Sequence, residues 1–180
     1  MEFLSELWMP ILLSAAFVWI ASSVMHMVLP HHKSDYVGLP DEERVTSALE
    51  GVAPGQYMFP FTTMAEMKSP EHQAKMEKGP NGILTIWPVA TNMGRNLGLM
   101  LLLYVVIGVF IAYVGSNSSL DGAPYLSVFR VCGAIAFMAH GLGWIPHMIW
   151  FGTKGFWAYT FDSVVYALLT AGVFGWLWPS

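Results

Sequence analysis

The protein has 180 residues, of which 55% are hydrophobic and only 11% are charged, and its formal net charge is −4. Because a soluble protein carries roughly 25% charged residues, this composition excludes an ordinary soluble domain and favours membrane-spanning segments. The acidic balance, without a basic patch or a phosphate-binding motif, argues against nucleic acid as a partner. A single cysteine, Cys132, excludes an intramolecular disulfide and any CxxC metal site.

Four apolar runs are each long enough to cross a bilayer, which takes about 20 residues in a helix. The predicted spans cover residues 9–29, 93–114, 125–151 and 156–178. Each contains small residues at helical spacing, which lets helices approach closely in lipid. A short turn, 152–155, makes the last two spans an antiparallel hairpin. The sequence therefore predicts an all-α fold, an integral membrane four-helix bundle that forms one transmembrane domain over residues 1–180.

The segment between the first two spans, residues 31–92, is predicted to be an ordered and partly helical loop. A short amphipathic helix is expected over 41–49, and a second over 69–78, where a Ser-Pro pair starts the helix and Gly-Pro ends it. Prolines forbid a regular helix over 53–61, and 82–89 is expected either as a strand or as a segment lying in the membrane interface. These apolar stretches should cover the mouth of the bundle or a partner protein.

The distribution of basic residues predicts the orientation. Seven of the eight Lys and Arg residues lie on the side of the long loop and the 152–155 turn, and only Arg130 lies on the other side. Because positive residues are retained in the cytoplasm, we expect residues 31–92 to be cytoplasmic and both termini to be periplasmic. The expected location is the inner (plasma) membrane of a bacterium, with the lipid bilayer as the surroundings of the spans.

Ionisable side chains inside the spans gather at one depth. The predicted buried polar layer consists of His26, Arg95, His140, His147 and Asp162. All of these except His140 lie within roughly 10 Å of the cytoplasmic boundary, at about 1.5 Å per helical residue. His140 is two turns deeper than His147 on the same expected face, while His31 and His32 lie at the mouth, just outside the first helix.

Three interpretations of this layer compete. In the first, Arg95 and Asp162 form a buried ion pair between the second and fourth helices, with the histidines hydrogen-bonded nearby. In the second, His26, His147 and Asp162 bind a transition metal, because neutral imidazole is the commonest metal ligand. In the third, His140 joins His147 and Asp162 in a proton or small-molecule pathway of the kind found in pumps and transporters.

The metal interpretation has two versions. Three methionines near the layer, Met25, Met27 and Met148, would suit a soft ion such as Cu(I). Alternatively, His26 and His147 could ligate one haem b from two different helices. Neither version is supported by a local metal-binding motif in the sequence.

Four runs stand out as motifs: HHKSDY at 31–36, APGQYMFP at 53–60, MKSPEHQAKMEKGP at 67–80 and FGWLWP near the end of the fourth span. In these runs the chain resembles a family of small bacterial inner-membrane proteins with no known function. The resemblance implies no activity, cofactor or partner.

No nucleophile–base set or local catalytic motif occurs in the sequence, so an enzyme is not indicated. The sequence favours a non-catalytic accessory or assembly subunit of a larger membrane complex, in contact with other membrane protein subunits or in a homo-oligomer. The alternative is a haem- or metal-binding redox or transport membrane protein that uses the His/Asp site in the cytoplasmic leaflet.

Overall fold

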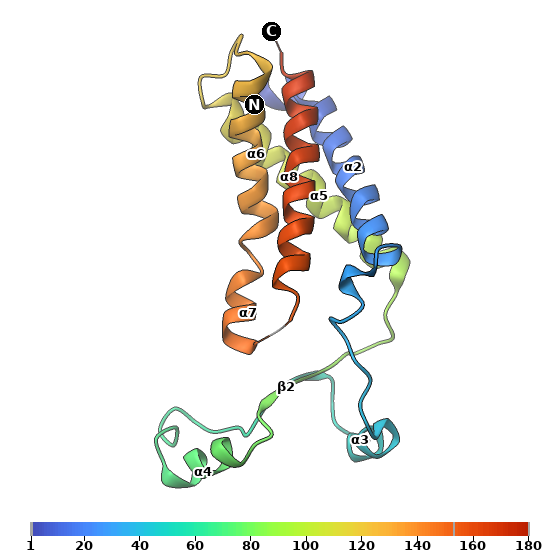
Figure 1. Ribbon diagram of the computed structural model, residues 1–180, viewed down its shortest axis with the longest axis vertical. Helices are drawn as coiled ribbons and strands as arrows, with labels where there is room; N and C mark the ends of the chain where they lie inside the picture. Colours follow the sequence, from blue (N-terminus) through green and yellow to red (C-terminus); the bar gives the residue numbers. More distant parts are fainter. Residues whose placement is uncertain (1, 153, 180) are drawn as a thin grey trace. The chain divides into compact units, whose positions relative to one another are not determined.

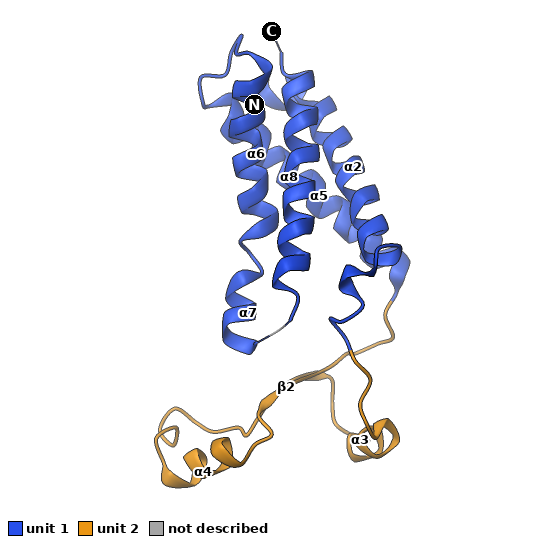
Figure 2. Ribbon diagram, in the orientation of Figure 1, with its two compact units in different colours: residues 1–36, 92–180 blue, residues 37–91 orange. Residues whose placement is uncertain are grey.

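The structure is a computed structural model that describes residues 2–152 and 154–179. The chain divides into two compact units (Figure 2). The first, here called the bundle unit, comprises the described parts of 1–36 and 92–180, and the second, the loop unit, comprises 37–91. The segment 31–36, which was predicted to belong to the loop, is therefore part of the bundle unit.

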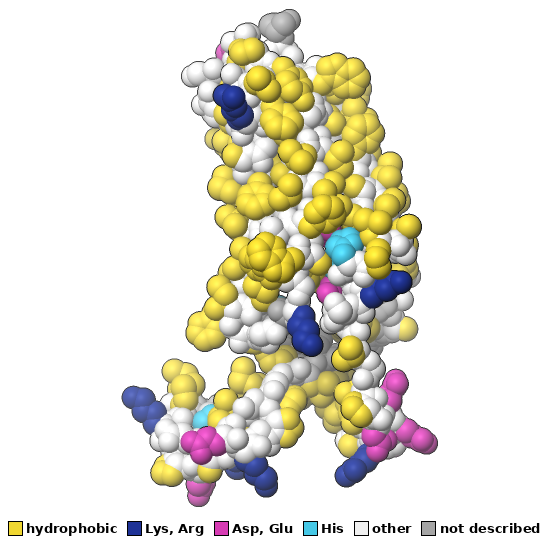
Figure 3. All heavy atoms as spheres, in the orientation of Figure 1, with side chains coloured by type: hydrophobic (Ala, Val, Ile, Leu, Met, Phe, Trp, Pro, Cys, Tyr) yellow, Lys and Arg dark blue, Asp and Glu magenta, His cyan; other side chains and the backbone are white. Residues whose placement is uncertain are grey.

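Within the described residues of the bundle unit, all regular secondary structure is helical (Figure 1). Its elements are α1 (Glu2–Glu6), α2 (Trp8–Met27), the 3₁₀ turn η1 (Pro30–His32), α5 (Met93–Ser116), α6 (Tyr125–Gly141), α7 (Ile145–Phe151) and α8 (Phe156–Leu177). In the described part of the chain, four stretches are long and apolar enough to span a membrane: α2, α5, α6 with α7, and α8. The predicted all-α four-helix membrane fold is thus confirmed, and the visible face of the bundle is largely hydrophobic (Figure 3).

The third span is not one straight helix. It is interrupted between Gly141, where α6 ends, and Ile145, where α7 begins. Pro146 lacks the N–H that would continue the hydrogen-bond ladder, and glycine at 141 and 143 adds backbone freedom at the same place. The prediction that His140 and His147 share one helical face is wrong, because the two residues lie on different helices on either side of this break.

Helix packing depends on close backbone approach. α8 packs against both α6 and α2, and α2 also packs against α5. A Cβ atom at Gly133 of α6 would lie only 3.0 Å from the Cβ of Ala171 on α8, and one at Gly108 of α5 would lie 3.3 Å from Ile11. The buried core between the helices includes Phe174, fully enclosed near the end of α8. Small residues therefore hold the bundle together, as expected for helices in lipid.

The loop unit contains two short helices and one two-stranded antiparallel sheet. Its elements are α3 (Glu42–Ala48), β1 (Gly55–Phe59), α4 (Pro70–Lys78) and β2 (Gly82–Ile86). The side chains of Asp41 and Ser69 cap the two helices by accepting hydrogen bonds from backbone N–H groups. β1 and β2 pair antiparallel, with Gly55 opposite Ile86 and Phe59 opposite Gly82. The pairing of these two strands was not predicted.

Candidate functional site

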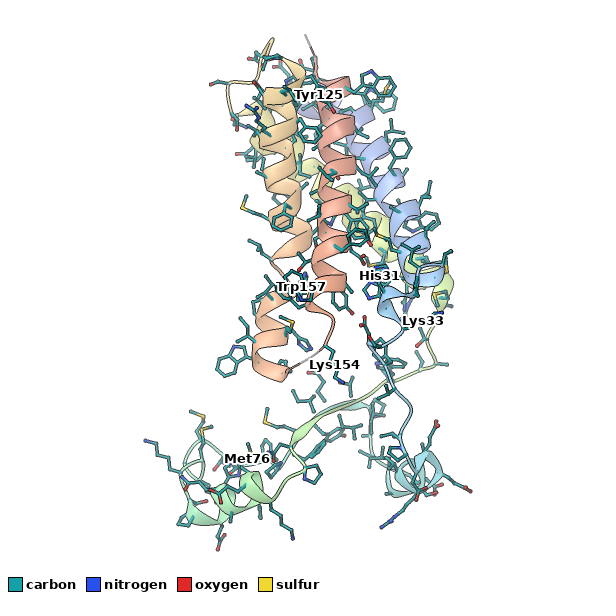
Figure 4. All side chains as sticks on the ribbon, viewed as in Figure 1. His31, Lys33, Met76, Tyr125, Lys154 and Trp157 are labelled. Atoms are coloured by element: carbon teal, nitrogen blue, oxygen red, sulfur yellow. The ribbon has the colours of Figure 1, made fainter. Side chains whose placement is uncertain are left out.

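The candidate site is centred on Asp162, a carboxylate of α8 whose residue is only 2% exposed. Both of its oxygens accept a hydrogen bond from a histidine. His31 Nε2 lies 2.7 Å from Oδ1, and His32 Nε2 lies 2.8 Å from Oδ2. Figure 4 labels His31 between α2 and α8. Two consecutive residues thus satisfy the two oxygens of one buried carboxylate, which would otherwise be costly to bury.

The turn after α2 places these histidines. α2 ends at Met27, and Leu29 adopts an extended conformation just before Pro30. Pro30 starts η1, and the N–H of Lys33 donates to its carbonyl at 3.1 Å. The proline fixes φ and tightens the turn, so that the chain folds back and both imidazoles reach α8.

His32 is held between two carboxylates. Its Nδ1 lies 2.6 Å from Asp35 Oδ2, while its Nε2 faces Asp162. A neutral imidazole can donate from only one nitrogen, so the two contacts together require the doubly protonated ring. Burial lowers the pKa of His32, but the hydrogen bonds to Asp162 and Asp35 and the attraction of both charges outweigh it, so the pKa is raised above its ordinary value.

His26 approaches the same carboxylate from the last turn of α2. Its Nε2 lies 3.9 Å from Asp162 Oδ2. Its Nδ1–H donates to the carbonyl of Ser22 at 3.0 Å, and its ring stacks on that of His32 with centroids 4.2 Å apart. The His26 side chain is 48% exposed. Because Nδ1 carries the proton in this arrangement, the Nε2 lone pair is free to face the centre of the cluster.

Aromatic rings enclose the cluster on the α8 side. Tyr159 packs on the His32 ring at 5.1 Å and Trp144 packs on Tyr159 at 5.4 Å. Gly155 (φ +106°) lies beneath them, and a Cβ atom there would come within 2.9 Å of Tyr159 and 3.2 Å of Asp35 Oδ1. Glycine at 155 is therefore required both by the backbone conformation and by the close approach of Asp35.

Of the predicted polar layer, His26 and Asp162 come together in the structure, and His31 and His32, which were predicted at the mouth, join them. Arg95 does not join them: it is exposed in the first turn of α5, and among residues 2–152 and 154–179 no ion pair links it to Asp162. The predicted Arg95–Asp162 pair is wrong, because α5 packs mainly on α2 and α6 and the carboxylate is already taken by histidines.

His147 and His140 also lie outside the cluster. His147 is exposed on α7, where its ring packs on Phe151 at 4.7 Å. His140 packs between Tyr104 and Tyr166, with ring centroids 5.7 and 5.5 Å away. His147 therefore lies outside the group that could hold a metal ion, in which His32 stands beside His26 and Asp162. Within the described chain, neither residue supports the predicted pathway to Asp162.

The haem version of the prediction does not fit this geometry. The Nε2 atom of His26, which would ligate the iron, faces the Asp162 carboxylate at 3.9 Å. A porphyrin ring cannot be inserted between these two groups. One face of the His26 ring is also covered by His32.

A single metal ion fits better. One ligand atom each from His26, His32 and Asp162 lies within 4.8 Å of the other two. In a tetrahedral zinc site with bonds of about 2.0–2.1 Å, ligand atoms are about 3.3 Å apart. The observed separations from Asp162 Oδ2, 2.8 Å to His32 and 3.9 Å to His26, fall on either side of that value. Both of these distances would change by roughly 0.6 Å in such a site, the stacked rings of His26 and His32 would have to turn toward one ion, and His32 Nε2 would have to give up its proton.

The second ring nitrogen of each candidate histidine ligand makes a hydrogen bond of the kind found in metal sites. A metal-ligating histidine normally donates its other N–H to a carboxylate or a backbone carbonyl, which orients the ring. The Nδ1 of His32 faces Asp35, and that of His26 faces the Ser22 carbonyl. With nitrogen and oxygen donors, the group suits Zn²⁺ or a similar divalent ion rather than Cu(I). Of the methionines predicted nearby, Met25 is buried in the core and Met27 is exposed.

The sequence placed His31 and His32 at the mouth of the bundle, outside the polar layer, and it did not single out Asp35. His31, His32 and Asp35 all belong to the run HHKSDY, and their spacing places a carboxylate one turn after a histidine pair. Comparison of the chain with protein-family models, curated proteins and solved structures finds no match. The resemblance to small bacterial inner-membrane proteins, which rests partly on this run, stays a prediction.

Proposed function

We propose that the protein is an integral membrane protein that binds one divalent transition metal ion, with Zn²⁺ as the first choice, through His26, His32 and Asp162. The observation that carries the proposal is the orientation of the two imidazoles. Each has its Nδ1 tied to an acceptor and its Nε2 directed at one buried carboxylate. His31 holds the second carboxylate oxygen and so orients Asp162.

Bound metal would join three separate parts of the bundle unit. The ligands come from the last turn of α2, from η1 and from α8. An ion shared by these elements would fix the 31–36 segment, from which the chain continues into the loop unit. Because metal bound to the folded state alone stabilises that state, occupancy would raise the stability of this end of the bundle.

Metal titration of the purified, chelator-treated protein in detergent tests the proposal. Isothermal titration with Zn²⁺, and the visible spectrum of the Co²⁺ form, should report one site per chain. His32→Ala should weaken binding by more than about tenfold, and His26→Ala, at a half-exposed position, provides a second variant that is expected to fold. His147→Ala is the matched control and should bind normally. Absence of a stoichiometric site, or an equal loss in His147→Ala, would overturn the proposal.

A second proposal concerns the loop unit and is an accessory or assembly role in a larger membrane complex. No described residue of 37–91 is buried, and an isolated pair of antiparallel strands is only marginally stable in water. The unit nevertheless exposes large apolar side chains, among them Tyr57, Met58, Phe59, Phe61, Trp87 and Val89. A surface of this kind favours a protein partner that covers it.

Stoichiometric co-purification in a mild detergent tests this second role. A defined partner should be retained by the native chain and lost when Phe61 and Trp87, exposed at 77% and 68%, are both changed to Ser. Val37→Ser, at an 88% exposed position at the edge of the unit, is the control. A chain that purifies alone, with normal metal binding, would contradict the accessory role and leave the metal site intact.

We further propose a bacterial inner membrane as the location, with η1 on the cytoplasmic side and both termini in the periplasm. α1 and the last turn of α8 lie at one end of the bundle unit, and Lys33 and Lys154 lie at the other (Figures 1 and 4). This charge distribution supports the orientation. Cys132 is fully buried, so a maleimide that cannot cross the membrane should label Ser118→Cys in intact spheroplasts but not Lys154→Cys. The reverse pattern would contradict the orientation.

A further inference from the structure

A groove runs along the outer face of the α6–α8 hairpin, away from the histidine cluster. Its volume is about 260 Å³. The lining includes Phe129, Gly133 and Phe137 of α6 and Val164, Leu168 and Ala171 of α8. One charged residue, Arg130, also lines it. The groove is thus apolar along its length and carries a single cation.

The sequence explains the shape of the groove. Phe129 and Phe137 lie one turn before and one turn after Gly133 on the same face of α6. A Cβ atom at Gly133 would lie 3.0 Å from the Cβ of Ala171, so the helix backbones are close at this point. Large rings separated by a glycine leave a channel whose walls lack contact partners unless a flexible apolar chain fills it.

Arg130 lies where a lipid headgroup is expected. It is five residues after the start of α6, which corresponds to about 7.5 Å along the helix. Its side chain is exposed, and the described residues offer no carboxylate within ion-pairing distance of it. A long arginine side chain extends its charge toward the membrane surface, and the guanidinium fork matches the oxygens of a phosphate group.

We propose that this groove binds one anionic phospholipid, with an acyl chain between α6 and α8 and the phosphate on Arg130. The charge of Arg130 favours a lipid over a second copy of the chain, which would bring apolar helix surface against an unpaired cation. The volume of the groove, about 260 Å³, also favours a lipid over a helix. One helical turn about 10 Å wide and 5.4 Å long occupies roughly 420 Å³. A methylene chain fits where a helix could insert only side chains.

Native mass spectrometry of the delipidated protein tests the site. Phosphatidylglycerol and diacylglycerol, which has identical acyl chains but no phosphate, are supplied in equal amounts. One phosphatidylglycerol should be retained per chain, with a preference of about tenfold, the ratio expected for one charge-assisted contact. Arg130→Gln should abolish the preference, and Ala134→Leu, which fills the groove at an exposed position, should reduce retention of both lipids.

Lys154→Gln removes a cation at the other end of the bundle and should leave lipid retention unchanged. Equal retention of the two lipids by the native chain, or an unaltered preference in Arg130→Gln, would overturn the proposal. A dimer that Ala134→Leu disrupts would also overturn it and assign the groove to a second copy. Metal binding does not involve Arg130, so this proposal and the metal proposal can fail separately.

Discussion

His32 makes the contacts that decide the chemistry of the cluster. Its two ring nitrogens face two carboxylates, Asp35 at 2.6 Å and Asp162 at 2.8 Å. In the absence of metal, this arrangement stabilises a proton on the ring. A metal ion at Nε2 would replace that proton, and Asp35 would then orient the ligand.

The stability of the metal-free protein should therefore depend on pH. Because the folded-state pKa of His32 is raised, its stabilising contribution is complete below the ordinary histidine pKa of about 6.5 and is lost as the pH rises through the folded-state value. We expect the melting temperature of the metal-free protein to fall over that range, and His32→Gln to flatten the dependence. Zn²⁺ affinity should change in the opposite direction, since ligands must lose protons. A metal-free melting temperature that rises with pH would contradict the arrangement.

Tyr166 offers a residue-scale test of the core. It is 7% exposed, and within the described chain its hydroxyl has no hydrogen-bond partner. An unsatisfied buried hydroxyl costs about 1–3 kcal/mol, so Tyr166→Phe should leave the melting temperature unchanged or raise it. Tyr166→Ala, which leaves a cavity, should lower stability by roughly 3–5 kcal/mol. Equal destabilisation by both changes would mean that the hydroxyl has a partner.

Sequence reasoning placed His26 and Asp162 in one layer and His31 and His32 at the mouth, but it did not predict that the two mouth histidines contact Asp162. Depth along the spans places His26 and Asp162 at one level, because the helical rise is constant. The roles of His31 and His32 depend on the turn at Pro30 returning toward α8, and hydropathy carries no information about that turn. Arg95 lies at the same depth as Asp162, but depth does not specify which way a helix faces.

At the scale of elements, the turn between α7 and α8 supports the site through Gly155. Its φ of +106° is rarely adopted by other residues, and a side chain there would contact Tyr159 and Asp35. Gly155→Ala should lower stability by about 1–3 kcal/mol and also weaken Zn²⁺ binding, because Asp35 would be displaced from His32. Gly143→Ala, where a Cβ atom meets nothing within 4 Å, is the control. Normal metal affinity in Gly155→Ala would show that this turn does not support the metal site.

Two elements departed from the sequence prediction for physical reasons. In the sequence the third span is one hydrophobic run, yet Gly141, Gly143 and Pro146 divide it into α6 and α7. The two-stranded sheet pairs residues 55–59 with 82–86, and such pairing depends on packing between distant segments rather than on local preference. The short helices α3 and α4 were predictable because their caps, Asp41 and Ser69, are local signals.

At the scale of the whole molecule, the four membrane-spanning stretches followed from the sequence because bilayer thickness fixes the length of an apolar helix. The predicted and the observed bounds of these four stretches differ by at most two residues at each end. The loop unit was harder to predict, since none of its described residues is buried and no core imposes an arrangement on it.

The most direct test of the metal site is X-ray absorption spectroscopy at the zinc edge of the Zn²⁺-loaded protein. The predicted spectrum has a first shell of about four nitrogen and oxygen ligands at roughly 2.0–2.1 Å, with the outer-shell scattering of at least two imidazoles, and His32→Ala should lose part of that scattering. An all-oxygen shell typical of a hydrated ion, or an imidazole signal that is unchanged in His32→Ala, would contradict a site built on His26, His32 and Asp162.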